Sequence, residues 1–417
     1  MRTPFWAVSN EIINFVYKIK TFSCQIQFFN LKWSEKKSLV AFFAEVRMSI
    51  LFTPIKIKNL ELPNRFVRSA TGDRFTEGAG FVADKKIALY QELAEGGVGL
   101  IISGVAHVHP AGKSTFSQTS IASDEYIPGL RRLTKVVQDR GIKIAAQLFH
   151  GGREAARYWN TVNQEAIAPS VIAEDPYFKG EYRSMTAEEI WNTVQAYGDA
   201  AKRAREAGFD AVQLHAAHAY LPSQFLSPFG NRRNDEWGGK LENRLRFHRE
   251  VYQDMRKKAG QDYPLLIKLG VQDGFAGGLE FSEGLQAAIG LAQWGYDSLE
   301  ISQGLRGKYY EETEFRTGIH TVDREGFFRD WAREVKKRVK VPVMMVGGLR
   351  TFVLMEEVIQ KGEADFVSLC RPLIREPHII KEWKKGSRRR AACISCNQCL
   401  ERNRKDGVLV CIFNEPL

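Results

Sequence analysis

The stretch GFDAVQLHAAHAY, residues 208–220, places a buried strand directly before a group of chemically active side chains. Residues 211–216 form a short, continuous apolar run, which is typical of a parallel strand that is buried on both faces. His215, His218 and Tyr220 follow at the end of this run. The pattern predicts a strand whose carboxyl end carries two imidazoles and a phenol.

A long helix is predicted just before this strand, over residues 186–208. Thr186 and Glu189 have the spacing of a capping box at its start, and Gly208 suits its end. The helix presents one apolar stripe, made of Ile190, Val194, Tyr197, Ala201 and Ala204. A helix that leads directly into a buried strand is the repeating unit of an α/β fold with a parallel sheet.

The same alternation continues along the chain. The predicted strands cover 65–70, 97–103, 142–149, 211–216, 264–270, 298–302, 341–347 and 365–370. Helical patterns lie between them, at 85–97, 186–208, 281–295 and 351–362. Eight strands, each followed by a helix or by a loop long enough to contain one, predict an α/β fold of the (β/α)8 TIM barrel type. A doubly wound sheet is the alternative, but no G-x-G-x-x-G motif follows the first strand.

The composition is that of an ordinary globular protein, with 417 residues, 44% hydrophobic and 26% charged. We expect the barrel at residues 48–385 and a short cysteine-rich C-terminal tail at 386–417. Residues 1–47 show no clear apolar leader, and Met48 resembles a natural start. We therefore expect these 47 residues to be a spurious or dispensable extension, with a folded accessory element as the alternative.

The charge pattern excludes some classes of partner. The net charge is +11, and residues 381–390 form one dense basic run, but no nucleic-acid recognition motif accompanies it. We therefore expect no binding to nucleic acid. No uninterrupted run of 18 apolar residues is present, so no membrane-spanning helix is predicted and we expect a cytoplasmic protein.

Polar residues and glycines gather where the predicted strands end, which is where TIM barrels carry their active sites. The third strand carries Gln147 and the fifth carries Lys268. Gly347 and Gly348 end the seventh strand and Arg371 follows the eighth, and these residues suit a phosphate group. An amide, a cation, a phosphate cradle and a histidine pair together favour FMN over hydrolytic chemistry.

The chain resembles the Old Yellow Enzyme family of FMN-dependent NAD(P)H oxidoreductases. The matching stretches are LFTPIKIKNLELPNRFVRSAT, QELAEGGVGLIISG, AAQLFHGGR, HAAHAYLPSQFLSPFGNRRNDEWGGKLENRLRF and VMMVGGLR. The fourth stretch is long and highly specific. The resemblance implies a TIM barrel that binds FMN, takes electrons from NAD(P)H, acts on a small-molecule substrate and belongs to a group of barrels that often form homo-oligomers.

The resemblance implies roles for five residues around the flavin ring. Ala70 and Thr71 would contact the ring through backbone groups, and Gly104 would let it approach closely. Gln147 would bond to the pyrimidine edge, because an amide can both donate and accept. Lys268 replaces the arginine that is often found at this place. It keeps a positive charge near N1 of the ring but loses the planar fork of a guanidinium.

The resemblance also implies how the phosphate is held. Gly347, Gly348 and Arg371 would surround it with backbone N–H groups and a cation. Cys370 stands where a glycine is common. Its backbone N–H would serve in this cradle, while its thiol would be incidental.

The histidine pair and the tyrosine receive catalytic roles by the same resemblance. His215 and His218 would donate hydrogen bonds to the carbonyl or nitro oxygen of a bound acceptor, which makes the β-carbon electrophilic. Hydride would pass from flavin N5 to that carbon, and Tyr220 would protonate the α-carbon as a general acid. An H-x-x-H pair alone is more often a packed or capping pair, and it can also bind a metal. The position at a strand end favours catalysis here.

Two regions bear on the flavin potential and the substrate preference, which cannot be carried over from other members. In SATGDRFTEG, residues 69–78, Gly72 and Arg74 stand near the places where some relatives carry an aromatic residue and a redox-tuning cysteine. The long stretch 302–326 is expected to cover the site. Its Tyr309 and Tyr310 would either line the cavity or anchor the loop.

The tail carries four cysteines in a C-x₂-C-x₂-C-x₁₁-C spacing: Cys393, Cys396, Cys399 and Cys411. Four thiolates so spaced can hold a [4Fe–4S] cluster, but a structural zinc or free thiols remain alternatives. The spacing resembles the branch that contains trimethylamine dehydrogenase and 2,4-dienoyl-CoA reductase, in which a cluster near this point receives electrons. Because the sequence ends shortly after the last cysteine, we expect an external electron acceptor.

Three functions remain open at this stage. The first is an ene-reductase that reduces activated C=C bonds of α,β-unsaturated carbonyl compounds. The second is a flavin and iron–sulfur dehydrogenase or demethylase that passes electrons to an external acceptor. The third is a flavin-binding electron carrier with little turnover of its own. The histidines and the tyrosine favour the first, and the tail cysteines favour the other two.

Overall fold

The computed structural model describes residues 49–156, 165–407 and 409–414. The predicted N-terminal extension, residues 1–47, lies outside the described residues. Within the described ranges, none of the helices combines the length and the apolar character that a membrane span requires.

Eight parallel strands close into a barrel, which confirms the predicted (β/α)8 fold. They are β3 (Phe66–Arg68), β6 (Leu100–Ile102), β9 (Lys143–Phe149), β12 (Ala211–Ala216), β13 (Leu265–Gly270), β14 (Ser298–Ser302), β15 (Val343–Met345) and β16 (Phe366–Leu369). Each strand pairs in parallel with the next, and β16 pairs with β3, so the ring is closed. Lys268 lies opposite His215 on one side and Glu300 on the other. This register brings polar residues of three strands to one level.

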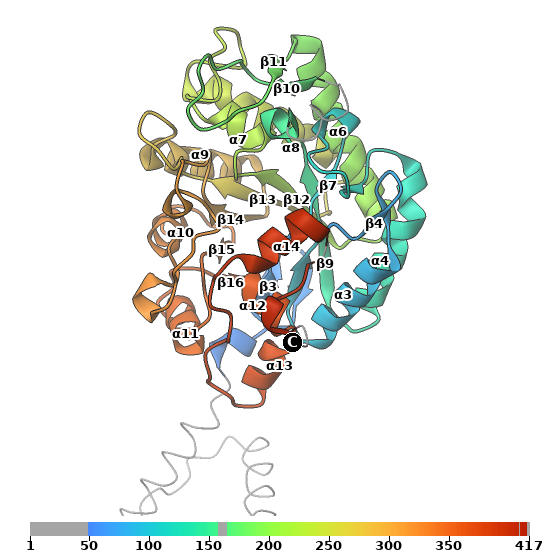
Figure 1. Ribbon diagram of the computed structural model, residues 1–417, viewed down its shortest axis with the longest axis vertical. Helices are drawn as coiled ribbons and strands as arrows, with labels where there is room; N and C mark the ends of the chain where they lie inside the picture. The colour runs from blue at the N-terminus through green and yellow to red at the C-terminus, as the bar shows by residue number, and fades with distance from the viewer. Residues whose placement is uncertain (1–48, 157–164, 408, 415–417) are drawn as a thin grey trace, which may run out of the picture. The chain divides into compact units, whose positions relative to one another are not determined.

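Helices cover the outside of the barrel (Figure 1). They include α3 (Asp84–Glu95), α4 (Ile127–Gln138), α6 (Ala187–Glu206), α8 (Leu241–Ala259), α9 (Phe281–Trp294), α10 (Arg329–Lys336), α11 (Phe352–Gln360) and α13 (Ile379–Lys384). The predicted capping box of α6 is confirmed, because Glu189 N donates to Thr186 Oγ1 at 3.1 Å and Thr186 N donates to Glu189 Oε2 at 2.9 Å. Gly208 follows the helix end with a φ of +87°.

A hairpin closes the amino-terminal end of the barrel. Its strands are β1 (Ile55–Ile57) and β2 (Leu60–Leu62), which pair in antiparallel fashion. The apolar side chains of this hairpin are buried in one cluster with residues from the starts of the barrel strands, among them Leu100, Leu266 and Phe366. With this end filled, the carboxyl ends of the strands are left to form a site.

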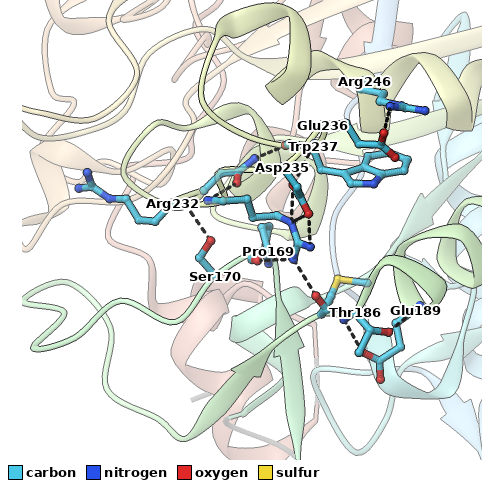
Figure 2. Close-up of polar contacts among 12 residues, drawn as sticks. Pro169, Ser170, Thr186, Glu189, Arg232, Asp235, Glu236, Trp237 and Arg246 are labelled. Atoms are coloured by element: carbon cyan, nitrogen blue, oxygen red, sulfur yellow. Dashed lines mark hydrogen bonds and ion pairs between the residues drawn. The ribbon is translucent and has the colours of Figure 1, made fainter.

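The long matching stretch around residues 231–237 has a structural role. Arg233 donates to the carbonyl oxygens of Pro169 at 3.1 Å and Met185 at 2.6 Å, and it pairs with Asp235. Pro169 follows β10 (Ala166–Ala168) and Met185 follows β11 (Tyr182–Ser184). Figure 2 shows these contacts next to the Thr186 cap. The stretch therefore holds the segment after β12 against the segment between β9 and α6, which contains β10 and β11.

The cysteine-rich tail returns to the barrel through α14 (Gln398–Asp406), drawn in red in front of the strands in Figure 1. Asn403 Nδ2 donates to the carbonyl oxygen of Asp73 at 3.1 Å. Arg74 Nη1 donates to the carbonyl oxygen of Arg404 at the same distance, 3.1 Å. These contacts attach α14 to the loop that follows β3, at the carboxyl ends of the strands.

Candidate active site

A cavity of about 640 Å³ lies at the carboxyl ends of the barrel strands. Its lining brings together residues that are far apart in the sequence. It includes every residue predicted around the flavin and the substrate: Ala70, Thr71, Gly104, Gln147, His215, His218, Tyr220, Lys268, Gly347, Gly348, Cys370 and Arg371. The volume is typical of a site for a cofactor or small ligand.

The turn after β12 is strained and firmly held. His218 and Ala219 both have left-handed backbone, with φ values of 60° and 63°, which costs an L-residue roughly 1–2 kcal/mol. The loop after β14 holds the turn, because His218 N donates to Gln303 O at 2.9 Å and Ala219 N donates to Gly304 O at 3.0 Å. Strain of this kind, imposed by surrounding hydrogen bonds, is typical of functional sites.

Ring contacts fix the positions of the three predicted catalytic side chains. The His215 ring centroid lies 4.9 Å from that of His218 and 4.8 Å from that of Tyr220, with both contacts edge-on. Phe149 packs edge-on against Tyr220 at 4.4 Å. His218 Nε2 shares a hydrogen bond with Ser302 Oγ at 2.7 Å. A substrate oxygen that bonds to this nitrogen must therefore displace the Ser302 hydroxyl.

Burial keeps both imidazoles neutral. Desolvation, followed by the influence of His218 and Lys268, holds the pKa of His215 well below its usual 6.5. Desolvation, Lys268 and Arg306 lower the pKa of His218 in the same way. Glu314 Oε1 lies 3.6 Å from His218 Nδ1, but its charge does not outweigh burial, so the contact is not an ion pair. A neutral imidazole still has one N–H to donate.

A buried ionic group, which the sequence analysis missed, lines the same cavity. Arg306 pairs with Glu314 at 2.6 Å and with Glu154 at 3.3 Å. Its guanidinium carbon lies 5.3 Å from the centre of the Tyr220 ring. Burial acts to lower the pKa of Arg306, but Glu314, Tyr220 and Glu154 together raise it well above its usual value. Glu154 directly follows the strand-end stretch HGGR, so its position was open to prediction.

The loop at residues 302–326 contributes to the site as expected, through Arg306, Glu314 and Phe315. Tyr309 and Tyr310 do not line the cavity, and they are 66% and 43% exposed. The ring of Tyr310 packs edge-on against Phe315, with centroids 6.0 Å apart. Neither residue supports the lining alternative, and the packing of Tyr310 supports the anchoring alternative for that residue.

A chain of buried hydrogen bonds forms the floor beneath the cavity. Gln147 Nε2 donates to Gln213 Oε1 at 2.7 Å, and Gln213 Nε2 donates to Glu300 Oε2 at 3.0 Å. The other carboxylate oxygen of Glu300 accepts from Ser69 Oγ at 2.7 Å and pairs with Lys268 Nζ at 3.2 Å. Lys268 Nζ also donates to Ser69 Oγ at 2.9 Å. Gln147 and Lys268 are thus oriented by Gln213 and Glu300, which do not line the cavity, and by Ser69, which does.

Gly104 is required by packing within the protein. A Cβ atom at this position would lie 2.7 Å from the carbonyl oxygen of Thr71 and 2.8 Å from Asp73 Oδ2. Gly104 N donates to Tyr90 Oη at 2.6 Å, and Lys86 Nζ pairs with Asp73 at 2.8 Å. This buried group sets the distance between the ends of β3 and β6, and with it the width of the cavity.

Gly347 and Gly348 have φ values of +133° and +71°, which only glycine adopts readily. Arg371 Nη1 donates to Arg316 O at 2.9 Å and to Asn397 Oδ1 at 2.6 Å. Among the described residues, the other N–H groups of Arg371 donate no hydrogen bond, and the side chain lines the cavity. The arginine can therefore bind an anion while it holds the tail.

The residues present fit FMN. The cavity has a polar edge at Gln147 and Lys268, where a ring with alternating donors and acceptors would bind. A phosphate would bind elsewhere in the same lining, beside Gly347, Gly348 and Arg371. Both glycines have positive φ values there.

The four tail cysteines line one small hollow, together with Arg371. Cys399 lines both this hollow and the large cavity. Burial, then Cys370 and Cys393, raise the pKa of Cys399 to about 12. Thiolates gathered so closely need the positive charge of a metal group to stay ionised. Among the described residues, however, no three His, Cys, Asp or Glu side chains are close enough to hold a single metal ion.

Comparison with known proteins identifies the family. Residues 50–389 match the model of the NADH:flavin oxidoreductase / NADH oxidase family. The chain belongs to this family. The resemblance to the Old Yellow Enzyme family is thereby confirmed.

Individual relatives agree with this assignment. The chain is 35% identical over 336 residues to NADPH dehydrogenase of Bacillus subtilis, covering 80% of this chain and 94% of that enzyme. It is 33% identical over 390 residues to cinnamate reductase of Clostridium sporogenes, covering 88% and 57% of the two chains. Among solved structures, 2-naphthoyl-CoA reductase in complex with 2-naphthoyl-CoA matches with a TM-score of 0.77 and 29% identity, covering 84% and 54%. The chain spans about half the length of several curated relatives.

Replacing Glu300 by Gln tests the floor of the cavity. The amide keeps the shape of the carboxylate but leaves the positive charge of Lys268 uncompensated, so the reduced, anionic cofactor is stabilised. We expect the two-electron midpoint potential of the bound flavin to rise by tens of millivolts, where about 30 mV corresponds to 1.4 kcal/mol. Equilibrium titration against redox dyes measures the shift.

Glu363→Gln is the matched control, because Glu363 is a buried carboxylate that pairs with Arg329 and does not line the cavity. The midpoint potential of the flavin in Glu363→Gln should equal that in the unmodified protein. An unchanged or lowered potential in Glu300→Gln would show that Glu300 does not balance Lys268 at the flavin.

Proposed function

We propose that this chain reduces activated C=C bonds, such as those of α,β-unsaturated aldehydes and ketones, at the expense of NAD(P)H. The observation that carries the proposal is the group formed by His215, His218 and Tyr220, whose rings contact one another at the edge of a cavity fitted for FMN. Hydrogen-bond donors and a phenol at one point suit a substrate that gains negative charge on oxygen and then a proton on carbon.

The histidines would bind the substrate oxygen. His215 is buried, and its Nδ1 atom has no hydrogen-bond partner among the described residues. Because burial keeps the imidazoles neutral, each can donate one N–H without carrying a full positive charge into the cavity. Removal of one such donor in other enzymes costs roughly 3–4 kcal/mol of transition-state stabilisation.

The proton would come from Tyr220. FMN, when bound and reduced by NAD(P)H, would supply the hydride that adds to the β-carbon of the substrate. Tyr220 Oη then gives its proton to the α-carbon, while Phe149 and the guanidinium of Arg306 hold the ring in place. One C–H bond forms at each carbon, the C=C bond becomes single, and the phenolate regains its proton from water.

One relative supports this substrate class, and another supports the reductant. One relative is a cinnamate reductase, and cinnamate has a C=C bond conjugated to a carboxyl group. Another is an NADPH dehydrogenase that the chain covers almost completely. The barrel alone can therefore support turnover with a nicotinamide nucleotide as the reductant.

A second candidate function is electron transfer through a [4Fe–4S] cluster to an external acceptor. Cys399 favours it, because this residue lines both the hollow of the four cysteines and the large cavity. Cys393, Cys396, Cys399 and Cys411 would bind the cluster, which would pass single electrons between the flavin and a partner. The same cysteines could instead bind zinc.

Replacing Tyr220 by Phe separates the two half-reactions. The variant keeps the ring and its packing on Phe149 but loses the proton donor. We expect reoxidation of the reduced flavin by cinnamaldehyde to slow by about 100-fold or more, in the range typical of a general acid. Flavin reduction by NADPH should stay within about twofold, as stopped-flow absorbance would show. Equal losses in both half-reactions would contradict the assignment.

The pH dependence of the same reoxidation step tests the state of the histidines. Because their pKa values lie well below 6.5, we expect no imidazole titration between about pH 6 and 8. The lowered pKa values also mean that the free energy of unfolding decreases as the pH falls below about 6.5. The reason is that the imidazoles of the unfolded chain take up protons that the buried imidazoles do not. A rate that changes with a midpoint near pH 6.5 would contradict neutral histidines.

Removal of the tail cysteines tests the second candidate. Protein purified without oxygen should contain about four iron atoms and four acid-labile sulfides per chain, and Cys396→Ala should lose both. Thr313→Ala, in the loop at 302–326, is a control that should keep them. Zinc without sulfide would instead support a structural zinc site. Metal-free protein that still reduces cinnamaldehyde would eliminate electron transfer through a cluster as the function.

A further inference from the structure

Arg74 is a cation in the cavity lining without an acidic partner. It lies in the loop after β3 and has left-handed backbone, with a φ of 59°. Its hydrogen bond to the carbonyl oxygen of Arg404 holds the guanidinium in place. Among the described residues, no carboxylate lies within ion-pair distance of Arg74, whereas Arg306 and Arg350 of the same cavity lining each have one.

Arg404 adds a second positive charge beside the first. It belongs to α14, and its side chain also lines the cavity. Its guanidinium carbon lies 5.9 Å from the centre of the Phe315 ring, and it pairs with Glu401 at 3.1 Å on the exposed side of the helix. Burial lowers the pKa of Arg74, and the nearby Arg404 lowers it further. Two like charges held together in this way are stabilised by a negative group placed between them.

Two other cations that line the cavity already have acidic partners. Arg306 is neutralised by Glu314 and Glu154. Lys268 is neutralised by Glu300 in the floor. Arg371 also has no carboxylate partner among the described residues, but it is the cation of the predicted phosphate cradle. Arg74 therefore brings a positive charge without an acidic partner to this wall, and Arg404, which shares its charge with Glu401, stands beside it. Arg74 is close enough to Tyr220 for the charges of the two groups to interact.

We infer that Arg74 and Arg404 form a binding site for an anionic oxygen group on a ligand whose reacting atoms lie at Tyr220. The inference rests on the proposed function, because Tyr220 marks the reacting bond. A carboxylate on the unsaturated substrate fits this site, and so does a phosphate of the nicotinamide reductant. Both are planar or tetrahedral oxyanions that a guanidinium binds through paired hydrogen bonds.

A pair of ligands that differ in one carboxylate provides the test. Dissociation constants for 4-carboxycinnamaldehyde and for cinnamaldehyde are measured on the oxidised, FMN-loaded protein, through the change in flavin absorbance. No turnover is needed, so the result does not depend on whether either compound is reduced. The rate of flavin reduction by NADPH and by NADH is measured separately on the same samples.

The variants are Arg74→Gln and Arg404→Gln, with Arg402→Gln as the matched control. Arg402 is an arginine of the same helix that pairs with Asp406 and does not line the cavity. If the anion belongs to the substrate, the first two variants should bind the carboxylated compound about 10- to 100-fold more weakly, as expected for a lost charge-assisted hydrogen bond. Cinnamaldehyde should bind within about twofold of the unmodified protein in all three variants.

If the anion belongs to the reductant, the loss should appear in the reduction rate with NADPH or NADH and not in binding of the carboxylated compound. Either result supports the anion site and names its source. Equal effects on the charged and the neutral compounds, or no effect on any anionic ligand, would overturn it. Absence of turnover with both compounds in the unmodified protein would instead contradict the proposed function, while the binding constants would still decide on Arg74.

Discussion

The buried ion pair between Lys268 and Glu300 is the interaction on which the site depends. Neither side chain is more than 3% exposed, so each charge would be costly without the other. Their remaining bonding capacity is taken up by Ser69 and Gln213, and Gln213 in turn orients Gln147. The closed barrel makes this possible, because it places residues of β9, β12, β13 and β14 at one level. The result is a rigid polar floor on which a flavin can lie with its charge balanced from below.

The groups above this floor are positioned by a single strained turn. His218 and Ala219 remain in left-handed backbone only because the loop after β14 accepts their N–H groups. The same loop supplies Arg306, whose charge lies against the Tyr220 ring. The proposed substrate contacts and the proposed proton donor therefore depend on the structure of this loop. The tail adds a further wall through α14, so that residues near position 400 face the same cavity as the end of β3.

Much of this could be predicted from the sequence, and the parts that could not share a physical reason. The barrel strands are continuous apolar runs, and residues such as Gln147 and His215 follow from their places at strand ends. Glu300 was missed because an acidic residue inside a strand reveals its partner only when the register is known. Arg306 and Arg404 were missed because loops and tails are positioned by tertiary contacts. The matching stretch around Arg233 was assigned to the family correctly, but its contacts are structural.

The most direct test of the account is an anaerobic titration of the FMN-loaded protein, followed by its visible spectrum. The account predicts that the purified chain binds FMN, that NADPH bleaches the flavin absorbance, and that an equivalent of cinnamaldehyde restores it with formation of the saturated aldehyde. Correctly folded protein that remains colourless and takes up no FMN would contradict the account. So would a reduced flavin that every unsaturated carbonyl compound leaves unchanged.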